Sequence, residues 1–158
     1  MSIENWMPAL ASKLGEITGI EQVHTYADLP GVLTVFPSIV IMPTRGPSAN
    51  YSAGGPNIAL HQVQATLYVS AQVMPEAYAL AVPFIGRVTR KLASALQLGG
   101  LTYGSGRINH VIPDPASPWY EGPGGIEYGT DSSGEPRRHL GIIFRLEVKE
   151  TETYTVSA

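Results

Sequence analysis

The stretch from residue 57 to residue 72 reads NIALHQVQATLYVSAQ, and it decides the fold. Apolar and polar residues alternate along it, which is typical of a β-strand with one face toward a core. The inward face takes His61, Val63, Ala65, Leu67, Val69 and Ala71, and the outward face takes Gln62, Gln64, Thr66, Tyr68, Ser70 and Gln72. This pattern predicts a long strand around which a sheet is built.

Shorter strands are predicted on both sides of this stretch. Residues 38–42 read SIVIM between two prolines, and this β-branched run is typical of a strand buried on both faces. A short extended segment precedes it at residues 23–26. Toward the C-terminus, residues 107–112 and the alternating residues 140–149 predict two more strands.

An N-terminal helix is indicated by apolar residues at spacings of three and four, starting near residue 2 and ending at Gly19. Pro8 lies within it, so the helix either starts later or is kinked. The residues of the stripe are Ile3, Trp6, Leu10, Leu14 and Ile17.

A second helix is predicted to begin at Pro75 and to end at the glycines 99 and 100. Pro83 lies inside it and predicts a bend. Its predicted inward residues are Tyr78, Val82, Ile85, Val88, Leu92 and Leu96.

Two segments rich in proline and glycine, residues 44–56 and 113–138, are predicted to be long loops that become ordered on assembly. Residues 151–158 are expected to form an extended tail that is either disordered or paired elsewhere. The predicted fold is therefore a single α+β domain spanning residues 1–158. It has a mainly antiparallel sheet of four to five strands, two helices packed on one face, and two long loops.

Composition excludes several function classes. The chain has 10 Lys plus Arg against 13 Asp plus Glu, whereas nucleic-acid binding requires a basic patch. It has no cysteine, so it offers neither disulfides nor thiolate metal ligands. No apolar stretch of about 18 residues is present, which disfavours secretion and membrane spanning and leaves the cytoplasm as the default compartment.

The sequence predicts no catalytic, cofactor or metal site. The glycines at 99, 100, 104 and 106 follow a helix and do not lead from a strand into one, so they lack a phosphate-binding arrangement. The four histidines at 24, 61, 110 and 139 show no paired spacing for a metal. His110 and Asp114 could form a catalytic triad with Ser105 or Ser117, but the sequence contains no nucleophile elbow.

A charge-free stretch indicates a subunit interface, because no Asp, Glu, Lys or Arg lies between residues 46 and 75. Gln62, Gln64, Thr66 and Tyr68 on the outward face can form hydrogen bonds without the cost of burying ions. The alternative is an ordinary neutral polar face exposed to water.

Four residues of the second predicted loop are further interface candidates. Trp119 and Tyr120 are large aromatic residues of the kind that anchor interfaces, although they could equally fold back onto their own domain. Arg137 and Arg138 could grip a carboxylate or phosphate of a neighbour, or could form a solvated loop end.

Taken in order, these elements resemble the tail-terminator proteins of long-tailed bacteriophages. The resemblance lies in the N-terminal helix, the segment FPSIVI at residues 36–41, the long strand leading to PEAY at 75–78, one long helix and a closing strand. It implies a homohexameric ring in the virion that ends tube growth and joins the tail to the head connector. DNA would pass through its channel without specific binding, and the protein would be made in the host cytoplasm.

Three alternatives stay open from the sequence. One is another ring component of the phage neck or tail tube. A second is a non-viral adaptor of ferredoxin-like architecture that binds a peptide strand at a sheet edge. The least favoured is a small hydrolase or isomerase built on His110, Asp114 and His139.

Overall fold

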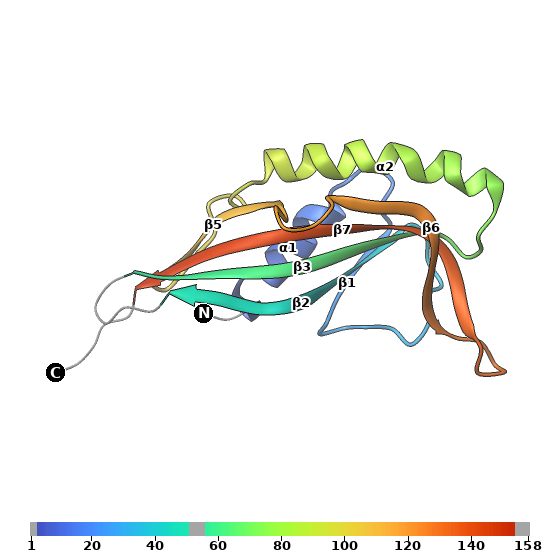
Figure 1. Ribbon diagram of the computed structural model, residues 1–158, viewed down its shortest axis with the longest axis horizontal. Coiled ribbons are helices and arrows are strands. Elements are labelled where there is room, and N and C mark those ends of the chain that lie inside the picture. The colour runs from blue at the N-terminus through green and yellow to red at the C-terminus, as the bar shows by residue number, and fades with distance from the viewer. Residues whose placement is uncertain (1–2, 51–55, 154–158) are drawn as a thin grey trace.

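The computed structural model describes residues 3–50 and 56–153 and is shown in Figure 1. Neither α-helix in these ranges is long and apolar enough to cross a membrane. In chain order the elements are η1 (Ile3–Asn5), α1 (Met7–Gly15), β1 (Gln22–Thr25), β2 (Ser38–Asn50), β3 (Pro56–Ser70), α2 (Pro75–Ser94), β4 (Thr102–Tyr103), β5 (Gly106–Pro113), β6 (Tyr120–Thr130) and β7 (Pro136–Thr153).

One mixed sheet contains all seven strands and curls strongly into a half-barrel. Its order is β1-β2-β3-β7-β5-β4, and β6 pairs with β7. The β1–β2 pair is parallel and the other pairs are antiparallel. The prediction of a mainly antiparallel sheet of four to five strands was therefore wrong. The sheet is mixed, because β1 pairs with β2 in parallel, and the sequence pattern missed the short β4 and the glycine-rich β6.

The first predicted loop, residues 44–56, is largely an extension of β2. That strand continues past Pro43 to Asn50 and pairs with β3, with register shifts after Pro43 and after Arg45. Because β1 pairs only with residues 38–41, Pro43 and Pro47 lie on a strand edge, where proline is tolerated. Residues 51–55 of the predicted loop lie outside the described residues.

The second predicted loop, residues 113–138, contains β6 and the start of β7, which form a hairpin that bends away from the sheet in Figure 1. Gly122 has φ +109°, and a Cβ there would lie 2.8 Å from the carbonyl oxygen of Gly141. The glycine therefore permits a close approach of the two strands. The described parts of both segments form strand pairs within one chain, and their ordering on assembly stays a prediction.

The predicted tail is also partly strand, since β7 includes residues 151–153. These residues pair with residues 56–58 of β3, which extends the ladder to the end of the described chain. Residues 154–158 lie outside the described residues.

Most of the apolar stripe predicted for the N-terminal helix is confirmed. Trp6, Leu10, Leu14 and Ile17 are at most 5% exposed and belong to the main core. The α-helix begins only at Met7, with Pro8 in its first turn, where a missing N–H is tolerated. The later start that Pro8 indicated is therefore confirmed, and the start near residue 2 is not.

Both helices pack against one face of the sheet, and they share the main core with β2, β3, β5 and β7. The helix α2 continues through Pro83 without interruption. Its phase differs from the prediction, because its buried residues are Ala77, Ala81, Phe84, Val88 and Leu92. Tyr78, Val82 and Leu96, which were predicted to point inward, are exposed by 41%, 54% and 45%.

The observed phase of α2 predicts that a leucine-to-alanine substitution lowers stability strongly at one position of this helix and hardly at all at another. Leu92→Ala should lower the free energy of unfolding by about 2–5 kcal/mol, because Leu92 is 3% exposed in the core. Leu80→Ala should change it by no more than about 0.5 kcal/mol, because Leu80 is 62% exposed. Urea unfolding of both variants measures this, and equal losses would contradict the packing described here.

Candidate assembly interface

The predicted interface face of β3 is divided between residues that a partner can reach and residues that the chain itself covers. Gln62 and Gln64 are partly exposed, whereas Thr66 and Tyr68 are each 5% exposed. A second apolar cluster, here called the outer cluster, covers Tyr68. It consists of Leu33, Val40 and Tyr68 with Phe36, Met42, Ile126 and Tyr128 packed against them.

Aromatic contacts hold the outer cluster together. The rings of Tyr68 and Tyr128 meet edge to face at 5.5 Å, and His139 lies 5.2 Å from Phe36 and 5.7 Å from Tyr68. Burial, with a smaller effect of Tyr128, raises the pKa of Tyr68 to about 12, so its hydroxyl stays neutral. These residues are part of the folded subunit.

The uncharged face of β3 lies beside charged residues of β7. The register places Gln64 opposite Arg145 and Gln62 opposite Glu147, so these side chains share one face. Arg145 Nη1 lies 3.2 Å from Glu121 Oε1, and Glu147 Oε2 lies 3.0 Å from His110 Nε2. The charge-free stretch therefore does not produce a neutral sheet face.

Trp119 folds back onto its own domain. Its ring lies 5.3 Å from that of Phe144, and its indole N–H donates to Thr89 Oγ1 at 3.1 Å. Its neighbour Tyr120 is 41% exposed. Of the two aromatic candidates, Tyr120 is the one whose side chain a partner can contact freely.

Arg137 and Arg138 are exposed and lie along their own hairpin. The Arg138 side chain crosses Gly125, where a Cβ would lie 2.1 Å from Nε. Hydrogen bonds from Ser133, a backbone N–H of Glu135 and the charge of Arg137 outweigh desolvation and lower the pKa of Asp131. Both arginines thus have interactions within the subunit.

The sequence did not predict an exposed apolar surface that follows one side of α2 and the turn after it, here called the apolar flank. It contains Tyr78, Val82 and Leu96, together with the partly buried Ile85 and the exposed Thr89. At its C-terminal end is a hollow of about 230 Å³. The hollow is lined by Thr89, Leu92, Ala93, Leu96, Val111, Ile112, Pro113 and Trp119.

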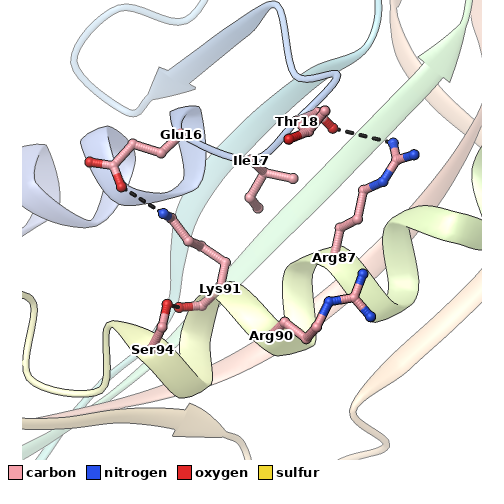
Figure 2. Close-up of a pocket in the computed structure, with 7 residues that line it drawn as sticks. All are labelled: Glu16, Ile17, Thr18, Arg87, Arg90, Lys91 and Ser94. Carbon is pink, nitrogen blue, oxygen red and sulfur yellow. Dashed lines mark hydrogen bonds and ion pairs between the residues drawn. The ribbon is translucent and has the colours of Figure 1, made fainter.

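The opposite flank of α2 faces the end of α1 across a basic cleft of about 550 Å³, shown in Figure 2. Arg87 Nη1 donates to the carbonyl oxygen of Thr18 at 3.2 Å, and Lys91 Nζ lies 2.6 Å from Glu16 Oε2. The hydrogen bond from Lys91, with the charges of Lys13 and Lys91, lowers the pKa of Glu16. The cleft therefore joins α2 to the end of α1 through its own polar contacts.

A buried polar cluster lies under the N-terminal segment. His61 Nε2 lies 2.6 Å from Glu150 Oε1, both side chains are at most 3% exposed, and the Tyr103 hydroxyl donates to Glu150 Oε2. The His61 ring also packs 5.1 Å from that of Trp6. Such a pair contributes to specificity of packing rather than to binding, since no solvent reaches it.

The groups considered for catalysis do not converge. Asp114 Oδ1 accepts the backbone N–H of Ala116 at 2.9 Å, His110 contacts Glu147, and His139 is enclosed by the outer cluster. Within residues 3–50 and 56–153, no group of three or more His, Asp or Glu side chains could hold a metal ion.

Comparison with known proteins gives no family assignment. No protein-family model matches the chain, and no curated protein matches it. The functional argument therefore depends on the surfaces described above.

The buried pair of His61 and Glu150 predicts a loss of folding stability at acidic pH. Burial opposes ionisation of Glu150, but hydrogen bonds from His61 and Tyr103 and the charge of His61 give a pKa below the ordinary 4.5. A lowered folded pKa contributes stability that is present above the unfolded pKa and is lost as pH falls through the folded pKa. Glu150→Gln should therefore flatten the fall in unfolding free energy below about pH 4.5.

Urea unfolding measured between about pH 7 and pH 3 tests this difference. Glu127→Gln is the matched control, because Glu127 is an exposed carboxylate of β6. The pH profile of Glu127→Gln should follow that of the unmodified protein. An unchanged acid slope in Glu150→Gln would show that the buried pair does not contribute as described.

Proposed function

We propose that this protein is a structural subunit that assembles into a ring, of the tail-terminator type found in long-tailed bacteriophages. The observation that carries the proposal is the apolar flank of α2. Tyr78 and Val82 lie on a helix fixed against the core and Leu96 lies in the turn just after it, yet each is at least 41% exposed. Apolar groups gathered on one face commonly mark protein–protein contacts.

The remainder of the chain is consistent with an assembly role. Its buried polar groups His61 and Glu150 pair with each other, and its basic cleft is occupied by internal contacts. The partners proposed are further copies of this chain, the tail tube and the head connector. The ring would end tube growth in the virion and join the tail to the head, after synthesis in the host cytoplasm.

A ring of this kind must let DNA pass without retaining it. The subunit has a formal net charge of −3, so it lacks the excess of cations that gives affinity through counterion release. No cofactor is required for this role. The charge supports passage of DNA without specific binding, for a terminator and equally for another ring component of the neck or tube.

The adaptor alternative would require a sheet edge that accepts a peptide strand. Two candidates in the described part of the chain are the edge of β2 beyond residue 41 and the edge of β6 that does not pair with β7. Both carry prolines, which lack backbone N–H donors: Pro43 and Pro47 on β2, and Pro123 on β6. Both strands also have two register shifts in their pairing. Prolines and bulges are the features that block strand addition at edges, so a ring contact through α2 is favoured.

Substitution of one flank residue should weaken assembly without unfolding the subunit. Val82→Asp places a charge where the contact between subunits must exclude water. The oligomer of this variant should therefore dissociate at protein concentrations at least about tenfold higher than the oligomer of the unmodified protein. Leu80→Asp is the control. It lies two residues earlier on the same helix, about 200° around the axis.

Sedimentation velocity across a concentration series measures the effect. The unmodified protein and Leu80→Asp should show the same concentration-dependent oligomer, and Val82→Asp should be shifted toward the monomer. Circular dichroism should give the same helix content for all three. An unmodified protein that is monomeric at every concentration would contradict the proposal.

A further inference from the structure

We infer that the basic cleft between α2 and the end of α1 binds one phosphate group, held by Arg87 and Arg90. The ligand is inorganic phosphate or a small phosphate monoester, which share this group. The basic cleft lies on the opposite flank of α2 from the apolar flank. The inference therefore goes beyond the proposed function and does not depend on it.

Internal contacts use only part of the charge in the basic cleft. Glu16 is the one acid among the described residues that line it, and two lysines engage this carboxylate. Lys91 Nζ lies 2.6 Å from Glu16 Oε2, and Lys13 Nζ lies 3.8 Å from Glu16 Oε1. In the described part of the chain, no carboxylate forms an ion pair with Arg87 or Arg90. Both guanidinium groups are thus left without an acid.

The two arginines are neighbours on the surface of α2. They are three residues apart, a spacing that places side chains next to each other on a helix. Figure 2 shows both of them on one side of the basic cleft and the ion pair of Lys91 and Glu16 on the other. Because adjacent like charges repel, an anion bound by both arginines would remove an unfavourable interaction.

Arg87 is held in position before a ligand binds. Its guanidinium carbon lies 4.9 Å from the centre of the Phe84 ring, and its Nη1 donates to the carbonyl oxygen of Thr18 at 3.2 Å. At Gly19, whose φ is +97°, a Cβ would lie 3.3 Å from Nη1, so the glycine permits the chain after α1 to approach this arginine. The other N–H donors of Arg87 have no acceptor among the described residues.

Arg90 is the more accessible of the two arginines. Its side chain is exposed, and no hydrogen bond or ion pair within the described residues engages it. It lies back along α2 over Gly86, where a Cβ would be 3.2 Å from its Nη1. Because residue 86 has no side chain, Arg90 can lie close to the helix on the same side as Arg87.

The charge of the basic cleft fits a phosphate group better than a carboxylate. Three cations and one acid line it, which gives a net charge of +2 in a chain whose net charge is −3. A phosphate monoester carries about −1.5 to −2 at neutral pH and offers three acceptor oxygens, which suits two guanidinium groups. The volume of about 550 Å³ lies within the range of about 300–1,000 Å³ that is usual for small-molecule sites.

The cationic cluster is too short to follow a nucleic acid. Arg87, Arg90 and Lys91 are the only Lys or Arg between residues 75 and 101, and they span about 6 Å of helix. Duplex DNA carries one charge per about 1.7 Å of its axis and binds through many successive phosphates. The cluster therefore fits one compact anion and not a polyanion.

Titration calorimetry with inorganic phosphate and with glycerol 3-phosphate tests the inference. The unmodified protein should bind at least one of them with a dissociation constant below about 1 mM. Arg90→Gln should weaken this binding at least about tenfold, because it removes charge-assisted hydrogen bonds. Arg45→Gln is the matched control and should bind like the unmodified protein, since Arg45 is an exposed arginine of β2 outside the basic cleft.

Glu16→Gln should change the affinity in the opposite direction. It removes the acid that Lys13 and Lys91 engage, so phosphate should bind more tightly, a gain that misfolding could not produce. Tighter binding of glycerol 3-phosphate than of phosphate would identify an ester as the ligand, and the reverse would identify the free ion. Either order supports the inference.

Four results would overturn the inference. One is no binding of either probe up to about 10 mM. The second is equal affinity in Arg90→Gln and the unmodified protein, and the third is weaker binding in Glu16→Gln, since both would place the anion elsewhere. The fourth is displacement of phosphate by a short DNA duplex at lower concentration, which would show a polyanion site. None of the four bears on assembly through the apolar flank.

Discussion

The structure depends on the central position of β7. One edge of this strand pairs with β3 along most of its length, and the other edge is divided between β5 at residues 146–152 and β6 at residues 136–144. Its inward residues Leu140, Ile142, Phe144, Leu146 and Val148 are at most 1% exposed and meet the helices. Loss of this strand would separate the half-barrel into parts that could not bury a common core.

This arrangement also determines which surfaces remain for partners. The main core needs only one stripe of α2, so the neighbouring apolar residues Tyr78, Val82 and Leu96 are left at the surface. On the other face, β6 and the segment before β2 enclose Tyr68, and Tyr128 fixes the turn at Pro30. The packing of α2 on the main core thus holds the proposed contact surface in a fixed position.

The sequence predicted those elements whose side chains repeat with a clear period. Residues 57–72 and 140–149 alternate, and both stretches are strands except for residues 71 and 72, which lie beyond the end of β3. Residues 44–50 and 120–130 were predicted as loops, because proline and glycine usually interrupt strands, but here an edge position and a close strand contact accommodate them. The α2 phase was misjudged because two adjacent apolar stripes fit a helical period equally well. Glu150 was detectable in principle, since it follows the inward alternation of Leu146 and Val148, but its partner His61 becomes adjacent only in the sheet.

The central claim, as proposed above, is that the subunit assembles into a closed ring through the apolar flank of α2. Negative-stain electron microscopy of the concentrated protein tests this most directly. The account predicts closed rings of uniform diameter, with a central channel and one subunit number. Symmetric dimers, or single subunits at every concentration, would contradict it.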